Sequence, residues 1–166
     1  MEAPRYAPVD HPKDLWIDGG FLYAVSQGDG TLQCFDLDRF DPTDPAEWAF
    51  EWAVGVGRLP NTVIVAGNYA FVGNRHDSTV SWFDLRNPAP VVLKKNFAKL
   101  PSGVTRLSAL GYQVFAPMIG GDVRVLDLAV KDHVTSVKPG GILRTDKEPW
   151  GVAVDSEQAR IFVPQG

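Results

Sequence analysis

The chain repeats one pattern at a nearly constant interval. Three segments run from a polar loop into an alternating stretch that ends in Asp-Leu, and they are QGDGTLQCFDL at 27–37, NRHDSTVSWFDL at 74–85 and IGGDVRVLDL at 119–128. The aromatic residue of the segment before each of them, and of a fourth such segment near the C-terminus, recurs every 44 to 48 residues. A period of this length is typical of repeat architectures.

Each repeat unit contains short segments with the composition of β-strands. A proline precedes a first apolar segment, a turn leads to the segment with the aromatic residue, and a loop leads to the Asp-Leu segment. Three units carry a fourth piece, FEWAVGV at 50–56, VVLKKNF at 91–97 and HVTSVKP at 133–139. The strands are rich in Val, Ile, Phe and Trp and none shows a sustained helical period. Four short strands at this spacing predict an all-β chain, a β-propeller of four-stranded antiparallel blades.

The period divides the chain into an N-terminal segment and about three and a half blades. The insertion DPTDPAEW carries the one helical signal, because Asp44 suits the N-cap of a short helix and Pro45 its first position. The expected parts are an N-terminal segment 1–13, a first blade 14–56 with the insertion at 41–48, a second blade 57–98, a third blade 99–148 and the first half of a fourth at 149–166.

Three and a half blades cannot close a ring alone, because propellers typically have about four to eight. Either the chain is part of a larger propeller, which we prefer, or copies associate to complete the ring. In the second case the segment RYAPV at 5–9 is the candidate outer strand for the incomplete blade. In both cases the strands at 150–164 leave an unpaired edge, which natural sheets avoid exposing.

The Asp-Leu ending has a structural explanation. Because side chains alternate along a strand, Val80 and Trp82 are expected to pack between neighbouring blades, with Leu85 as a further candidate. The Asp that follows the last large apolar residue can accept backbone N–H groups where the chain turns into the outer strand. We therefore interpret the three acids as structural and not catalytic: Asp36, Asp84 and Asp127.

The second unit resembles the YVTN-type propeller repeat. It has a proline before an apolar run, then Phe-Val, then NRHDSTVSWFDL, and WGVAVDSEQARIFVPQ at 150–165 is similar to the opening half of that repeat. The LVIVD-type and NHL-type repeats have a similar pattern, and the resemblance covers about residues 12–166. It implies a propeller and a periplasmic or cell-surface location. Related propellers include lyases, lactonases, haem enzymes and quinone-dependent dehydrogenases, so the fold does not choose an activity.

The composition of the chain argues against some classes of binding partner. The formal net charge is −4 and no run of Lys and Arg occurs, which argues against nucleic acid or an anionic membrane as the main partner. The single cysteine, Cys34, allows no intrachain disulfide and no CxxC motif. The N-terminal residues lack the basic and apolar blocks of a signal peptide, and no stretch approaches the roughly 18 apolar residues of a membrane span.

In a propeller, the loop that enters each innermost strand and the loop between the second and third strands emerge together at the mouth of the central channel. Loops on a rigid scaffold commonly carry binding groups. The candidate ligand- or partner-binding residues at this mouth are Lys13, Asn61, Arg75, His76, Asp77, Arg106 and Trp150.

His76 has the most versatile chemistry of these residues, because a histidine can act as a general base or bind a metal or haem, and adjacent Asp77 would tune it. The alternative is that NRHDST is a polar hairpin loop. Arg106 would line the channel and meet an anion, or else extend its stem along the blade. Trp150 is a candidate for ligand stacking.

The other tryptophans and histidines are less suggestive. Trp16 and Trp82 are expected to pack between blades, and Trp48 and Trp52 to hold the insertion at the outer edge. The histidines occupy three different structural positions and no HExxH motif occurs, so we assign no metal site and no cofactor.

The leading interpretation is a non-catalytic scaffold that binds another protein or further copies of itself. It rests on the repetition of structural residues and on the absence of a recognisable reacting constellation in the sequence. The rival interpretation is a propeller enzyme, a lyase, a lactonase or a cofactor-dependent oxidoreductase, with its site at the mouth of the channel.

Overall fold

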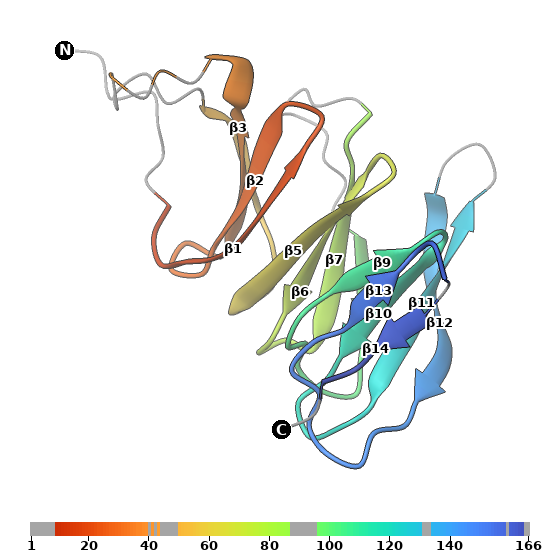
Figure 1. Ribbon diagram of the computed structural model, residues 1–166. Coiled ribbons are helices and arrows are strands. Elements are labelled where there is room, and N and C mark those ends of the chain that lie inside the picture. Colours follow the sequence, from red (N-terminus) through yellow and green to blue (C-terminus); the bar gives the residue numbers. More distant parts are fainter. Residues whose placement is uncertain are drawn as a thin grey trace.

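The computed structural model describes residues 9–39, 41, 43, 50–86, 96–130, 134–158 and 160–164. These residues form three four-stranded antiparallel sheets and one two-stranded sheet (Figure 1). The predicted all-β propeller architecture, with about three and a half blades, is therefore confirmed. No helix in the described part of the chain has the length and hydropathy of a membrane span.

Neighbouring strands of each sheet are also neighbours in the sequence, so every blade is a simple meander. A 3-10 helix, η1 (Leu37–Arg39), follows the third strand. The strands are β1 (Pro12–Asp18), β2 (Phe21–Ser26), β3 (Thr31–Asp36) and β4 (Phe50–Gly55) in the first sheet, β5 (Pro60–Ala66), β6 (Tyr69–Asn74), β7 (Thr79–Asp84) and β8 (Asn96–Lys99) in the second, β9 (Ser108–Leu110), β10 (Gln113–Pro117), β11 (Val123–Val130) and β12 (Val134–Leu143) in the third, and β13 (Ala153–Asp155) and β14 (Arg160–Phe162) in the fourth.

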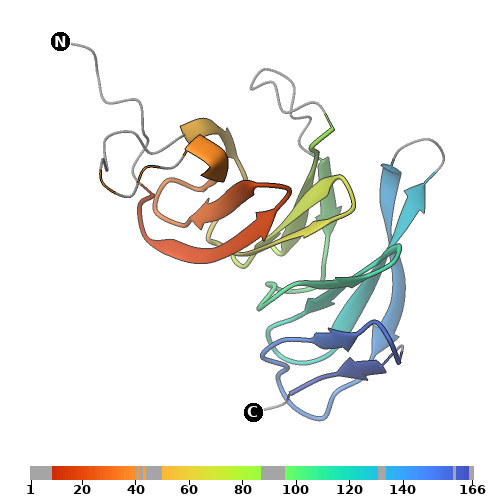
Figure 2. The ribbon, with the colours of Figure 1, turned by 45° about the horizontal axis from the view of Figure 1, so that its top comes forward.

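The sheets follow one another in an arc whose first and last members lie apart (Figure 2). The first strands of successive sheets approach one another, β1 with β5, β5 with β9 and β9 with β13, so they form the inner side of the arc. Tight turns keep these strands close to their partners. Gly19 and Gly20, between β1 and β2, have φ angles of 56° and 80°, as a type I′ hairpin requires.

Each pair of neighbouring sheets encloses an apolar core. Val80 and Trp82 lie in the core between the second and third sheets, as predicted, and Leu85 packs against the core between the first and second. A third core joins the last two sheets around Phe115 and Val152. Burial of such side chains stabilises the fold by roughly 1.5–3 kcal/mol each.

Trp52 differs from its predicted position. It is buried in β4 opposite Cys34, and its ring lies 6.2 Å from that of Tyr23 in the first core. The alternation of β4 turns position 52 toward the second blade, so the prediction that this residue holds the insertion at the outer edge is wrong. Trp48 lies outside the described residues.

The turn after the Asp-Leu segments forms in two blades as predicted. The Asp36 carboxylate accepts the N–H of Asp38 at 2.9 Å, and the Asp84 carboxylate accepts the N–H of Arg86 at 3.0 Å. Asp127 is different, because β11 continues past it to Val130 and its carboxylate instead accepts a hydrogen bond from the Gln113 side chain at 2.9 Å.

The outer strands agree only partly with the expected fourth pieces. β4 coincides with the first of them, β12 extends beyond the third, and β8 overlaps the second only at Asn96 and Phe97. Residues 91–95 lie outside the described part, as do most of the insertion at 41–48 and of the segment RYAPV.

Candidate functional site

The two sets of loops that were expected at the channel mouth are joined by backbone hydrogen bonds. The N–H of Gln27 donates to the carbonyl of His11 at 3.1 Å in the first blade, and the N–H of Arg75 donates to the carbonyl of Leu59 at 2.9 Å in the second. The third blade has a similar bond, from Ile119 to Gly103 at 2.8 Å. We call the end of the molecule formed by residues 10–13, 27–30, 57–61, 75–78, 101–106, 119–122 and 149–150 the mouth end.

Buried Asn74 fixes the start of the loop that carries Arg75, His76 and Asp77. Its side-chain oxygen accepts the N–H of Gly57 at 3.0 Å, and its amide nitrogen donates to the hydroxyl of Ser81 at 2.8 Å. The loop is therefore held between the second and third strands of its own blade and the segment that enters it.

Asp77 also holds this loop. Its carboxylate accepts the N–H of Arg58 at 2.7 Å, and this hydrogen bond, with a smaller contribution from His76, lowers the pKa of Asp77. Nδ1 of His76 lies 3.5 Å from the Asp77 carboxylate, and the His76 side chain is about half exposed. The Asp77 carboxylate thus closes the loop and also lies beside His76.

Among the remaining predicted residues, Asn61 makes a contact between neighbouring blades. The Asn61 amide donates to the carbonyl of Thr105 at 2.6 Å, which joins the second blade to the third. Arg106 precedes β9 and is exposed, and a methyl group added at Gly151 would lie 3.6 Å from its Cδ. Trp150 is 69% exposed.

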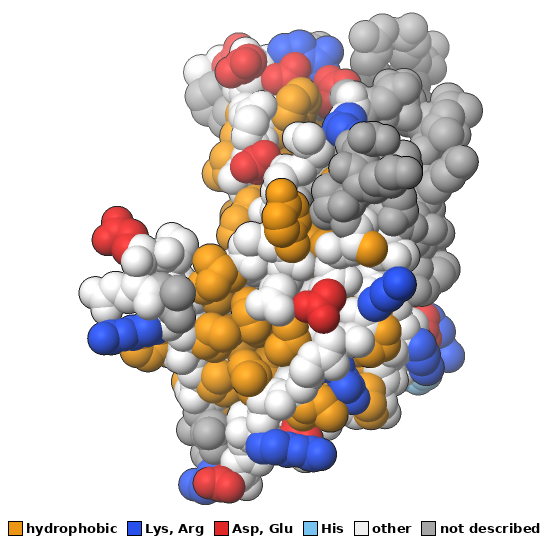
Figure 3. All heavy atoms as spheres, turned by 90° about the vertical axis from the view of Figure 1, so that its right-hand side faces the viewer, with side chains coloured by type: hydrophobic (Ala, Val, Ile, Leu, Met, Phe, Trp, Pro, Cys, Tyr) orange, Lys and Arg blue, Asp and Glu red, His pale blue; other side chains and the backbone are white. Residues whose placement is uncertain are grey.

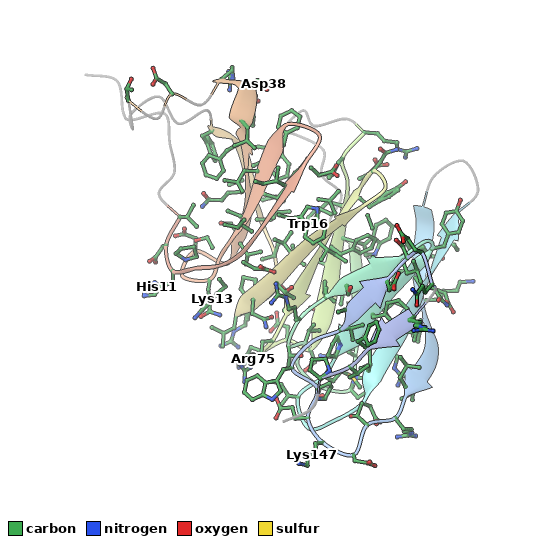
Figure 4. The ribbon with its side chains drawn as sticks, in the orientation of Figure 1. His11, Lys13, Trp16, Asp38, Arg75 and Lys147 are labelled. Atoms are coloured by element: carbon green, nitrogen blue, oxygen red, sulfur yellow. The ribbon has the colours of Figure 1, made fainter. Side chains whose placement is uncertain are left out.

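Lys13 and Arg75 lie at the same end of the molecule (Figure 4). The loops that carry the candidates thus lie along one end of the arc. A common ligand site for all seven residues stays a prediction. No group of three or more His, Cys, Asp or Glu side chains in the described ranges is arranged to hold a metal ion.

A hollow on the inner side of the arc contains none of the seven candidates. Its volume is about 480 Å³, and turn residues Gly67 and Gly111 place part of its wall toward the end opposite the mouth end. We call it the inner hollow. The lining residues are Trp16, Ile64, Val65, Ala66, Gly67, Ser108, Ala109, Gly111 and Val154.

Trp16 was predicted as a packing residue, yet 39% of it is exposed, and it lines the inner hollow. In the sequence, the only feature that could have indicated this hollow is the set of small residues opposite Trp16. Ala66-Gly67 and Ser108-Ala109 stand where larger side chains would fill the space.

Cys34 is not a suitable nucleophile. It is buried in the first core, and burial, followed by the charges of Glu51 and Asp36, raises the pKa of its thiol to about 12. A nucleophilic cysteine requires the opposite shift, because the thiolate is the reactive form.

The two ends of the arc expose apolar residues. Leu15 and Ile17 on β1 are 60% and 61% exposed, and Phe162 on β14 is 54% exposed. Around the last core, Leu110, Leu143 and other residues are only partly buried. Seen from the side of β11 and β12, hydrophobic side chains gather in one area of the surface (Figure 3).

Comparisons with solved structures agree with this architecture. Hydrazine synthase from Kuenenia stuttgartiensis matches 91% of this chain at 15% identity, with a TM-score of 0.72, over 41% of its own chain. A candidate 6-phosphogluconolactonase from Bacteroides uniformis matches 93% of this chain at 14% identity, with a TM-score of 0.76, over 47% of its own chain. The computationally designed protein Ika4 matches 96% at 12% identity, with a TM-score of 0.66, over 93% of its chain.

This chain thus spans less than half the length of the two natural proteins and nearly all of the designed one. No protein-family model and no curated protein sequence matches it. At these identities the structural matches show the fold and no activity. Together with the meander of each sheet and the arc of sheets, they identify the fold of this chain as a β-propeller.

Proposed function

We propose that the protein is a non-catalytic propeller scaffold whose two open sheet faces bind protein, either another protein or further copies of itself. The proposal rests on a difference in exposure between residues at equivalent positions of the first and second blades. Val63 and Val65 on β5 are 0% and 8% exposed because they pack against the first sheet, whereas Leu15 and Ile17, 48 residues earlier on β1, are 60% and 61% exposed.

The register of the first sheet explains the difference. Trp16 lies opposite Tyr23, which packs toward the second sheet, so Leu15 and Ile17 point to the other face. That face has the composition of a surface between blades, and a preceding blade would cover it. Exposed apolar patches of this kind commonly mark protein interaction sites.

The opposite end offers a complementary feature. Among the described residues, β14 pairs with β13 and with no second strand, so its outer edge offers backbone donors and acceptors to a further strand. Phe162 lies on the face of this sheet that points away from the third core. Both ends therefore suit contact with β-structure, and the YVTN-type repeat and a periplasmic or cell-surface location belong to the same proposal.

The test is the native mass of the purified protein compared with its mass under denaturing conditions. If the protein self-associates, its native mass should be a multiple of its denatured mass. In the double variant Leu15→Ser/Ile17→Ser, the native mass should fall to the denatured mass. Tyr112→Ser is the matched control, because Tyr112 is 69% exposed but belongs to neither open face. A denatured mass above 18.2 kDa would instead assign the covering blades to the same polypeptide.

If the native mass equals 18.2 kDa in wild type and the double variant alike, self-association is wrong. If wild type and the double variant were then also digested by a protease at equal rates, the exposed apolar face would need no partner to cover it. In that case the scaffold proposal would fail.

A second candidate is an enzyme with its site at the mouth end. The observation in its favour is the exposed His76 beside Asp77 and Arg75 on a fixed loop. If it is correct, His76→Ala and Arg106→Ala keep the fold and lose the same ligand, while a pure scaffold keeps its partner in both variants.

A further inference from the structure

The inner hollow is built by strands from all four sheets. Trp16 comes from β1, Ile64 and Val65 from β5, Ser108 and Ala109 from β9 and Val154 from β13. Figure 4 shows Trp16 on β1 well away from the mouth end, where Lys13 and Arg75 lie. The hollow is therefore separate from the predicted site at the mouth and from the exposed side chains of Leu15 and Ile17.

None of the described residues that line the inner hollow has a charged side chain. Most of these residues have apolar side chains, and Ser108 contributes a hydroxyl. The hollow is open to solvent on one side, so a charged group placed there would lose part of its hydration and gain no counter-charge from the described lining residues. This chemistry favours an uncharged ligand.

Small residues open the space opposite the indole. Gly67 and Gly111 have φ angles of 58° and 55°, and a Cβ added at either would meet no atom within 4 Å. Ala66 and Ala109 add only methyl groups. The volume of about 480 Å³ falls in the range of small-molecule sites, roughly 300–1,000 Å³.

Trp16 is the aromatic residue among the described residues in the wall of the hollow. Trp16 is 39% exposed although its neighbours Ile64 and Val65 are buried, so part of this residue is accessible to a ligand. Aromatic pairs gain energy from offset or edge contacts beyond the burial of area.

We propose that the inner hollow binds a small uncharged ligand with an aromatic ring, which packs against the indole of Trp16. The hydroxyl of Ser108 is available to hydrogen-bond one polar atom of the ligand. This site is independent of the scaffold function, because it is not formed by the open faces at the two ends of the arc.

The first test uses N-phenyl-1-naphthylamine, an uncharged aromatic probe whose fluorescence rises in apolar surroundings. We expect saturable binding of one probe per chain. Trp16→Ala should weaken it by about tenfold, and Trp16→Phe should restore most of the affinity, because the aromatic contact is retained. Trp150→Ala is the matched control, since it removes an equally large but more exposed side chain at the mouth end.

Two further measurements keep the test decisive if Trp16→Ala fails to fold. Ala109→Leu fills the hollow from the opposite wall and should also abolish binding. The anionic analogue 8-anilino-1-naphthalenesulfonate should bind at least about tenfold more weakly, because no described lining residue offers a cation to its sulfonate.

The proposal is overturned if the uncharged probe shows no saturable binding to the wild type. It is also overturned if Trp150→Ala or Leu15→Ser/Ile17→Ser weakens the binding as much as Trp16→Ala does. In the latter case the probe adheres to the open face and not to the hollow.

Discussion

The carboxylate of Asp14 on β1 accepts a hydrogen bond of 2.9 Å from the hydroxyl of Thr62 on β5. The same carboxylate oxygen accepts the backbone N–H of Val63 at 3.0 Å, and the Thr62 hydroxyl oxygen accepts the N–H of Leu107 at 3.2 Å. One continuous series of hydrogen bonds therefore joins the inner sides of the first three blades.

Asp14→Ala should destabilise the protein by about 2 kcal/mol, because it leaves the hydroxyl of Thr62 and the N–H of Val63 without their acceptor in a buried place. Chemical denaturation followed by circular dichroism measures the free energy of unfolding. Asp18→Ala on the same strand is the control and should change it by less than about 0.5 kcal/mol, since Asp18 is exposed. Equal losses in the two variants would show that the bonds to Thr62 and Val63 are not stabilising.

Gly103→Ala should destabilise the contact between the second and third blades at the mouth end. A Cβ at this position would lie 2.1 Å from the backbone oxygen of Arg75, so one of the two loops must move, at a cost of about 1–3 kcal/mol. Gly55→Ala is the matched control, because a Cβ there meets nothing within 4 Å. The melting temperatures of the two variants compare these costs directly, and a drop in Gly55→Ala alone would contradict the predicted loop contact.

The stability of the protein should depend on the ionisation of Asp77. Because its pKa is lowered in the folded state, the ionised carboxylate contributes stability that is complete above the ordinary Asp pKa of about 3.9 and is lost as the pH falls through the lower folded value. Asp77→Asn, which keeps an oxygen acceptor for the N–H of Arg58, should be less stable than wild type at pH 7 and equal to it in strong acid. Asp77→Ala should remain less stable at every pH. Melting temperatures between about pH 2 and pH 7 measure this, and parallel curves for wild type and Asp77→Asn would disprove it.

The repeat predicted the architecture because its signals are local. The turn at Gly19-Gly20 and the Asp-Leu endings at positions 36 and 84 can each be interpreted within a few residues, and each forms as expected. Other strand predictions hold only in part, as for the outer strands β8 and β12. In the third blade, β9 begins only at Ser108, after an isolated bridge between Val104 and Met118, so Arg106 precedes the strand.

The surfaces could not be predicted in the same way. Leu15, Trp16 and Ile17 form one apolar run, which predicts burial for all three. Their exposure depends on which sheet lies before β1 and on how large the residues of β9 are, and both are non-local properties. Similarly, the bond between Asp77 and the N–H of Arg58 joins residues 19 positions apart, and no motif in the sequence signals it.

Cys34 should report unfolding through its reactivity. The thiol is buried and burial raises its pKa to about 12, so at pH 8 only about one molecule in ten thousand carries a thiolate, against about a quarter for an ordinary cysteine. Reaction with 5,5′-dithiobis(2-nitrobenzoic acid) at pH 8 should therefore be at least about a thousandfold slower in the native protein than in guanidinium chloride. Because Cys34 lies opposite Tyr23 and Trp52 in the core between the first two blades, Asp14→Ala should speed the native reaction by increasing transient opening. Rapid, stoichiometric labelling of the native wild type would show that this core is open and would contradict the packing of the first blade against the second.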